Sequence, residues 1–226
     1  MEVLRAFLLY LRRELMYIAK FIDHSILKPQ TTEKDLEEQI KRCIELKVYA
    51  VCVHPYWVKR AVELAGGGLV VCAVVSFPFG MDTKEQKLSQ CLESLERGVK
   101  ELDIVMNFSA LKSGQLPYVR EEFLAIGRNT EGFVRKVIIE AGYLTEEEKK
   151  LAVELIAESG MEFVKTSTGF SFPGATEEDV KLLYSASKGR LKVKASGGIR
   201  TKEQALRFLS LGAERIGTSA TSDILS

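Results

Sequence analysis

The chain is 226 residues long and 46% hydrophobic, so it can bury a substantial core. Its 32 lysines and arginines nearly balance its 31 aspartates and glutamates, and the net charge of +1 argues against a nucleic acid or an anionic membrane as a partner. We therefore expect its partners to be small molecules and further copies of the chain.

The first twenty residues begin with an apolar run. Arg12, Arg13 and Glu14 interrupt it, and no small-residue cleavage site follows, which argues against a signal peptide or a membrane span. Apolar side chains instead recur at helical spacing, at Leu4, Phe7, Leu8, Leu11, Leu15 and Ile18. We predict an amphipathic helix over residues 1–20 that packs on the main domain or on a neighbouring subunit.

The four cysteines show neither a C-x-x-C pair nor a histidine at metal-ligand spacing. They stand at Cys43, Cys52, Cys72 and Cys91. This usage is typical of buried thiols in a reducing compartment. We therefore expect a cytoplasmic protein with no metal site and no cofactor.

Beyond residue 20, short β-branched runs alternate with longer helical patterns. Several helical patterns begin at a threonine that can cap the helix, followed by acidic residues, at Thr32, Thr145, Thr176 and Thr201. The β-branched runs predict eight strands, at residues 20–24, 49–53, 69–76, 101–107, 134–140, 162–167, 191–196 and 214–218.

Valine-rich and isoleucine-rich strands separated by capped helices are typical of βα units in a parallel sheet. Eight such units in about 200 residues favour a closed (β/α)8 TIM barrel over an open doubly wound sheet, which usually has fewer strands. No linker or composition break divides the chain. We predict an α/β fold with an N-terminal helical extension (1–20) and a single catalytic barrel domain (21–226).

Three charged residues interrupt the apolar strands near the carboxyl ends, where barrel enzymes hold their active sites. Asp103 lies in the fourth strand, Lys165 in the sixth and Lys194 in the seventh. Strands six and seven are neighbours in a barrel, so we expect the two lysines to lie close together. Two ammonium groups about 4 Å apart repel by roughly 4 kcal/mol at an effective dielectric near 20, which would lower the pKa of one lysine by about 3 units.

A lysine that is neutral near physiological pH can attack a carbonyl and form a Schiff base. The second lysine, still charged, could then relay protons together with Asp103. The residues alone leave a structural role open as well, because a lysine at a strand end often extends to solvent and an aspartate in a strand often forms an ion pair.

The loops after the last three predicted strands contain glycines and hydroxyls that suit an anion. Glycine lets backbone N–H groups approach a phosphate closely, and the helix that follows adds a favourable partial charge. Barrels often bind phosphate in the loops after strands seven and eight. The candidate residues are Gly169, Gly197, Gly198, Gly217, Thr218 and Ser219.

Five motifs together resemble those of deoxyribose-phosphate aldolases in type, order and strand position. They are DHSILKP (23–29), VCVHP (51–55), ELDIVMN (101–107), FVKTSTGF (163–170) and VKASGGIR (193–200). The resemblance implies a metal-independent class I aldolase on a TIM barrel, which reversibly cleaves 2-deoxy-D-ribose 5-phosphate into acetaldehyde and D-glyceraldehyde 3-phosphate. It also makes a homo-oligomer, a dimer or a tetramer, the expected assembly.

The resemblance further assigns roles to individual residues. Lys165 matches the Schiff-base lysine, Lys194 the second lysine that lowers its pKa, and Asp103 the acid and base of the proton relay. Positions near the substrate are matched by Asp23, Cys52 and Thr168. The phosphate-binding loops are matched by Gly169, Gly197, Gly198, Gly217 and Ser219.

Phe170 departs from the pattern of those family members that have a lysine directly after the STG glycine. We expect backbone N–H groups, hydroxyls and Arg200 to bind the phosphate instead. Phosphate affinity would then be lower, and aldehydes without a phosphate would be relatively better tolerated.

Two other functions also fit these residues. One is another Schiff-base barrel enzyme, such as a transaldolase or a fructose-phosphate type of aldolase, that acts on a longer sugar phosphate. The other is a phosphate-binding barrel that has lost catalysis, although such a module has no need for two facing lysines. Use of acetaldehyde as the donor substrate would distinguish a deoxyribose-phosphate aldolase from both alternatives.

Overall fold

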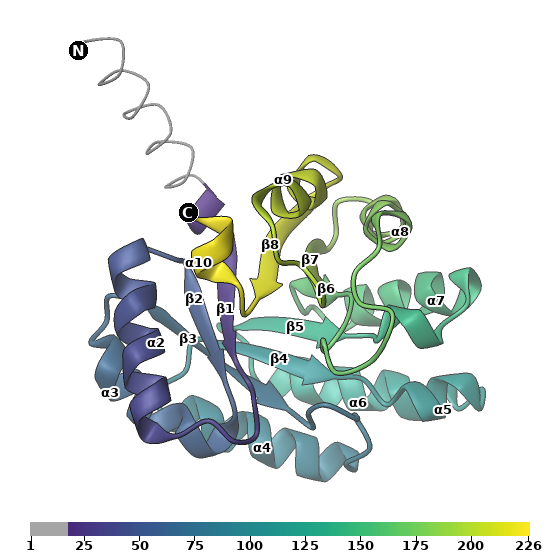
Figure 1. Cartoon of the computed structure of the whole chain (residues 1–226). Coiled ribbons are helices and arrows are strands. Elements are labelled where there is room, and N and C mark those ends of the chain that lie inside the picture. The colour runs from purple at the N-terminus through teal and green to yellow at the C-terminus, as the bar shows by residue number, and fades with distance from the viewer. Residues whose placement is uncertain (1–17) are drawn as a thin grey trace.

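The computed structural model describes residues 18–226, and in it eight parallel strands close into a barrel in chain order, with helices around the outside (Figure 1). The predicted TIM barrel is thereby confirmed. The strands are β1 (Ile22–Ile26), β2 (Ala50–Val53), β3 (Val70–Val75), β4 (Glu101–Val105), β5 (Val134–Ile138), β6 (Phe163–Lys165), β7 (Lys192–Ser196) and β8 (Ala213–Thr218).

Helices or short helical turns connect successive strands. The α-helices are α2 (Glu33–Leu46), α3 (Val58–Ala65), α4 (Lys84–Glu96), α5 (Phe108–Lys112), α6 (Leu116–Asn129), α7 (Glu146–Glu158), α8 (Glu177–Ser187), α9 (Lys202–Ser210) and α10 (Thr221–Ile224). Two 3-10 turns, η1 (Pro55–Trp57) and η2 (Ala141–Tyr143), lie between strand and helix.

The predicted threonine caps are confirmed at four helices. In each case the side-chain oxygen of the capping threonine accepts a hydrogen bond from the backbone N–H three residues later, which satisfies one of the free donors of the first turn. The caps are Thr32, Thr145, Thr176 and Thr201. Local sequence therefore sets where these helices begin.

Side chains along each strand alternate between the barrel interior and the surrounding helices. Most of the outward side chains are aliphatic and join the main core between strands and helices, as Val51, Leu102, Val164 and Val193 do. A smaller apolar cluster, separate from the main core, is made of Leu27, Cys52, Cys72 and Val74. The barrel interior is available to charged residues, which sets up the site.

The strand register places the charged residues beside one another. Lys165 on β6 is level with Lys194 on β7, and Lys194 is level with Arg215 on β8. Asp103 on β4 is level with Lys136 on β5. All five side chains are buried, so the barrel encloses a layer of charges at its centre.

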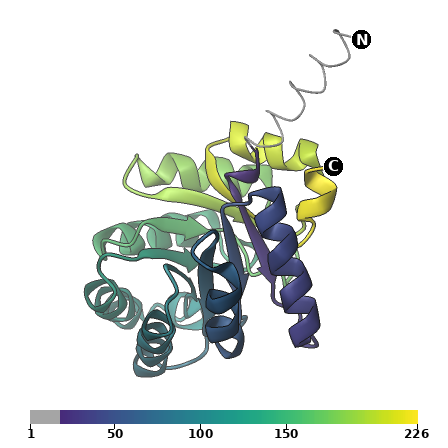
Figure 2. The same ribbon diagram turned by 90° about the vertical axis from the view of Figure 1, so that its left-hand side faces the viewer.

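The barrel closes where β1 pairs with β8. Outside this seam, α2 and the C-terminal α10 lie side by side, as both views show (Figure 1, Figure 2). His24 on β1 joins them, because its Nδ1 lies 2.8 Å from Thr221 Oγ1 and its Nε2 lies 3.2 Å from Gln39 Oε1. His24 therefore belongs to the outer packing and faces away from the cluster of charges.

The helix predicted over residues 1–20 falls almost wholly outside the described residues, so the domain boundary proposed at residue 20 is described on one side alone. Both stay predictions. Within residues 18–226, no helix combines the length and the apolar character that crossing a membrane requires.

Candidate active site

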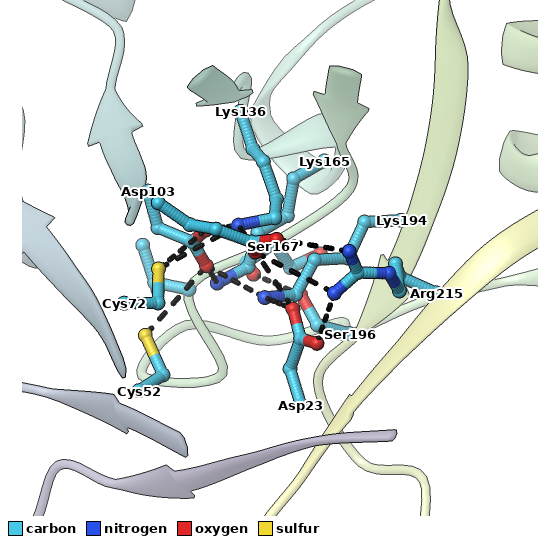
Figure 3. A network of polar contacts seen from close by, with 12 residues as sticks. Asp23, Cys52, Cys72, Asp103, Lys136, Lys165, Ser167, Lys194, Ser196 and Arg215 are labelled. Carbon is cyan, nitrogen blue, oxygen red and sulfur yellow. Dashed lines mark hydrogen bonds and ion pairs between the residues drawn. The ribbon is translucent and has the colours of Figure 1, made fainter. Parts of the chain in front are cut away.

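Asp103 is the centre of the charged cluster in the barrel (Figure 3). Its Oδ2 accepts hydrogen bonds from Lys165 Nζ at 2.7 Å and from Lys194 Nζ at 2.8 Å. Its Oδ1 accepts from Lys136 Nζ at 3.0 Å. The three residues that the sequence singled out for catalysis, Lys165, Lys194 and Asp103, thus meet at one carboxylate.

Two further carboxylates complete the cluster. Asp23 accepts from Lys194 Nζ at 2.5 Å and from Arg215 Nη1 at 2.7 Å. Glu101 lies deeper in the barrel, where its oxygens are 2.6 Å from Lys136 Nζ and 3.0 Å from Arg215 Nη2.

The electrostatics of the cluster keep most of its members ionised. Burial alone would lower the pKa of Lys194, but attraction to Asp103 and Asp23 outweighs it and raises that pKa. Lys136 is shifted in the same direction, because burial is outweighed chiefly by Asp103. Burial would raise the pKa of Asp103, yet the surrounding lysines hold it well below its ordinary value of 3.8.

One detail of the predicted electrostatics is corrected by this geometry. Lys165 and Lys194 were expected to repel each other directly, whereas their ammonium groups donate to one shared carboxylate oxygen. An anion between two cations offsets much of their repulsion. The pairwise figure derived from the sequence therefore does not describe this site, and the charge of the whole cluster has to be considered.

Two thiols approach Asp103 from the opposite side. Cys72 Sγ donates to Oδ1 at 3.2 Å and Cys52 Sγ lies 3.8 Å from Oδ2. With Asp103 they form the one group of described residues that has the spacing of metal ligands. Burial raises the pKa of Cys72, so its thiol is protonated, and lysines already occupy both oxygens of Asp103. Metal ligation requires the thiolate, so this chemistry disfavours a metal here.

A cavity of about 230 Å³ opens above the cluster at the carboxyl ends of the strands. Of the three lysines that contact Asp103, Lys165 lines this cavity. Lys28 and Arg200, which are exposed, line it as well. Thr168 and all the residues predicted for phosphate binding also line the cavity, so the amine of Lys165 and the glycine loops share one space. The predicted phosphate-binding residues are Gly169, Gly197, Gly198, Gly217, Thr218 and Ser219.

Glycine is required at Gly217 for space. A Cβ atom there would lie 2.7 Å from Cβ of Ser196 and 3.2 Å from Cε of Lys194. Gly197 has a φ of +97°, and a Cβ at that position would lie 3.0 Å from Cα of Gly174 in the loop after β6. These glycines thus let the lysine and the loops pack closely around the cavity.

Two predicted hydroxyls hold the loops in place. Thr168 Oγ1 donates to Glu140 Oε2 at 2.6 Å and accepts from the backbone N–H of Phe170 at 3.1 Å. Thr218 Oγ1 donates to the carbonyl of Ile199 at 2.7 Å, which ties the loop after β8 to the loop after β7. Both side chains therefore position the walls of the cavity.

Four charged residues of this region were not predicted from the sequence: Glu101, Lys136, Arg215 and the cavity-lining Lys28. Lys136 stands in an apolar β-branched run, just as Lys165 does, and Arg215 alternates with the inward-facing Gly217. A search for every charge inside a predicted strand would have found both. Lys28 lies within a quoted motif but beyond its strand, where alternation gives no direction.

Residues 17–219 match the sequence model of the DeoC/LacD family aldolases. The chain belongs to this family. It is therefore an aldolase, an enzyme that makes or breaks a carbon–carbon bond. A deoxyribose-phosphate aldolase from Aquifex aeolicus is 48% identical over 203 residues, which cover 90% of this aldolase and 92% of that protein.

Solved structures agree with the family assignment. The aldolase QR15 shares 48% identity with this aldolase at a TM-score of 0.89, over 92% of this chain and 94% of the other. The deoxyribose phosphate aldolase from Aeropyrum pernix, described as a unique tetramer, shares 31% identity at a TM-score of 0.87, over 96% and 94% of the two chains.

Proposed function

We propose that this aldolase reversibly cleaves 2-deoxy-D-ribose 5-phosphate into acetaldehyde and D-glyceraldehyde 3-phosphate through a Schiff base on Lys165. The observation that carries the proposal is the position of Lys165, whose amine contacts Asp103 on one side and lines the cavity with the glycine loops on the other. The names of the similar proteins support the choice of substrate.

The reaction begins when the neutral amine of Lys165 attacks the aldehyde carbon of the open-chain sugar. Loss of water from the adduct leaves a protonated Schiff base, which acts as an electron sink. The hydroxyl on C3 then loses its proton, the bond between C2 and C3 breaks, and glyceraldehyde 3-phosphate departs. The electron pair of that bond remains on the enzyme as an enamine.

Proton transfer completes the cycle. The enamine takes up a proton at its terminal carbon to become the Schiff base of acetaldehyde, and water hydrolyses it to acetaldehyde and free Lys165. Asp103 lies within hydrogen-bond distance of both Lys165 and Lys194, so it can pass protons between the reacting nitrogen and the second lysine. Lys194, whose raised pKa keeps it an ammonium, remains the charged partner of Asp103 in this relay.

The phosphate group is assigned to the far end of the same cavity. Gly197, Gly198 and Ser219 line the cavity, so their backbone N–H groups can bind a phosphate there, and Lys28 and Arg200 add two cations to the same lining. Phe170 lines the cavity as well and places an aromatic ring there instead of a further cation. This arrangement suits a phosphorylated substrate and leaves room for an uncharged one.

We also propose a homo-oligomer, supported by the tetramer named for the Aeropyrum pernix protein. A cytoplasmic location is proposed on the ground that all four cysteines are free and buried.

Trapping of the Schiff base tests the function. The chain is incubated with acetaldehyde, reduced with borohydride and mapped by mass spectrometry, with Lys28→Arg as the control because Lys28 is the other lysine of the cavity. We expect one adduct, on Lys165, and release of acetaldehyde from 2-deoxy-D-ribose 5-phosphate. An unmodified Lys165, or full cleavage activity in Lys165→Ala, would contradict the proposal.

A further inference from the structure

The cluster around Asp103 holds one more cation than it holds carboxylates. Its cations are Lys136, Lys165, Lys194 and Arg215, and its carboxylates are Asp23, Glu101 and Asp103; in each of them less than a tenth of the surface is exposed. A buried charge without a partner is costly, so a cluster with a surplus cation favours the loss of one proton.

The contacts indicate which proton is surplus. Lys136 lies within hydrogen-bond distance of Asp103 and Glu101, and Lys194 within hydrogen-bond distance of Asp103 and Asp23. Within residues 18–226, Lys165 contacts a single carboxylate oxygen, Oδ2 of Asp103, which it shares with Lys194. It also lines the cavity, where a departing proton can reach solvent.

Arg215 is the cation that creates the surplus from the floor of the barrel. Its guanidinium bridges Asp23 at 2.7 Å and Glu101 at 3.0 Å, and it stacks 3.4 Å from the ring centroid of Tyr49 beneath it. An arginine remains charged at any pH that the enzyme meets. Arg215 thus partly neutralises Asp23 and Glu101, and these two carboxylates offset less of the positive charge of the lysines.

We infer that Arg215 and Glu101, which lie below the reacting groups, are positioning residues that set how readily Lys165 gives up its proton. Arg215 promotes the loss of that proton, and Glu101 opposes it. Neither residue lines the substrate cavity, so both act through the charge of the cluster. The inference rests on the proposed Schiff-base function, and it adds that two residues at the opposite end of the barrel influence the ionisation of Lys165.

The titratable groups of the cluster around Lys165 come from the seven other strands of the barrel. They are Asp23 (β1), Cys52 (β2), Cys72 (β3), Glu101 and Asp103 (β4), Lys136 (β5), Lys194 (β7) and Arg215 (β8). Glu140 is bound to Thr168, and Lys28 and Arg200 line the outer cavity. All but Glu101 and Arg215 stay constant in the experiment below.

The test is the pH dependence of acetaldehyde trapping on Lys165 in single and double variants. Arg215→Met removes a cation, so we expect the acid limb of the profile to move to higher pH by about one unit, or about tenfold slower trapping near pH 7. Glu101→Gln removes an anion, so its limb should move to lower pH. The double variant removes one charge of each sign and should return towards the unmodified protein.

Three controls separate charge from structure. Arg215→Lys keeps the charge and should keep the profile. Arg207→Met and Glu177→Gln remove the members of an exposed ion pair whose atoms lie 2.7 Å apart, and neither should move it. If Arg215→Met does not fold, the direction of the shift in Glu101→Gln decides the matter alone.

Shifts in the same direction for Arg215→Met and Glu101→Gln, or no shift in either, would overturn the inference, because a purely structural role lowers both rates without opposite shifts. The proposed function fails separately. An unmodified protein that forms no adduct on Lys165 would overturn the function and the inference together, whereas a normal adduct with one pH profile in all variants would overturn the inference alone.

Discussion

Lys165 and Lys194 share a single acceptor, the Oδ2 atom of Asp103, at 2.7 and 2.8 Å. The two lysines are level with each other on neighbouring strands, and one carboxylate between them allows both to be buried. The pair is therefore coupled through an anion, and a change in either lysine alters how strongly Asp103 binds the other.

Replacing Lys194 tests this coupling. In Lys194→Leu the oxygen that was shared becomes available to Lys165 alone, which favours the ammonium form of Lys165. We expect acetaldehyde trapping to fall at least tenfold near pH 7 and to recover in part at high pH. Lys192→Leu, two residues earlier on β7 with an exposed side chain, is the matched control and should trap normally. Trapping that is indifferent to Lys194 at every pH would refute the coupling.

Phe170 gives a prediction about phosphate. Phe170→Lys places a cation in the wall of the cavity, so we expect KM for 2-deoxy-D-ribose 5-phosphate to fall about two- to fivefold, as a partly exposed ion pair allows. Cleavage of unphosphorylated 2-deoxyribose should not improve. Phe172→Lys is the control, because Phe172 is 93% exposed. An equal improvement in both variants would point to general electrostatic attraction.

The buried carboxylates predict how stability depends on pH. Burial would raise the pKa of Asp23, but Lys194, Lys136 and Arg215 outweigh it and lower that pKa below the ordinary 3.8. A lowered pKa contributes stability that is fully present above the unfolded value and is lost as pH falls through the folded one. We expect the urea concentration at the midpoint of unfolding to be highest near pH 6 and to decrease once the pH is lower than about 4.

Asp23→Asn should therefore be less stable near pH 6 by about 3 kcal/mol, yet lose less on acidification, because the group that titrates is gone. Asp223→Asn, at an exposed aspartate of α10, should follow the unmodified protein. If Asp23→Asn and the unmodified protein lose equal stability between pH 6 and pH 3, Asp23 is not a source of the acid sensitivity.

A second buried ion pair lies outside the barrel interior. Lys87 on α4 and Glu122 on α6 are fully buried, with Nζ and Oε1 2.9 Å apart. Lys87→Met leaves the Glu122 carboxylate buried without its cation, so we expect a loss of about 3–5 kcal/mol in the free energy of unfolding, measured with urea. Lys87→Met with Glu122→Leu should recover most of that loss, since two apolar side chains replace both charges.

The same two helices supply the control for that experiment. Lys84 and Glu121 also join α4 to α6, at 3.3 Å, but the glutamate side chain is 65% exposed. Lys84→Met should therefore cost no more than about 1 kcal/mol. A double variant at Lys87 and Glu122 that is no more stable than Lys87→Met would show that packing, and not the stranded charge, accounts for the loss.

Much of the fold could be predicted because its signals are local. Period-two alternation indicated which side chains face inward, threonines with acidic first turns marked helix starts, and eight repeated units indicated closure. The sixth strand was predicted over residues 162–167, whereas β6 covers Phe163–Lys165. Thr166, the next residue, bonds the backbone of Ser196 on β7 through its hydroxyl. Strand propensity does not include such a side-chain contact with a neighbouring strand.

The candidate site was only partly visible from the sequence. Lys165, Lys194 and Asp103 stood out because each places a charge in an apolar strand, and the glycine loops followed from their position after strands. The period-two alternation of the strands was enough to place these three charged side chains on the barrel interior. Only the tertiary structure decided which partners meet, since Arg215 and Asp23 lie 192 positions apart in the chain yet bond at 2.7 Å. Ion pairs depend on ångström separations across a closed barrel, and a local pattern does not encode them.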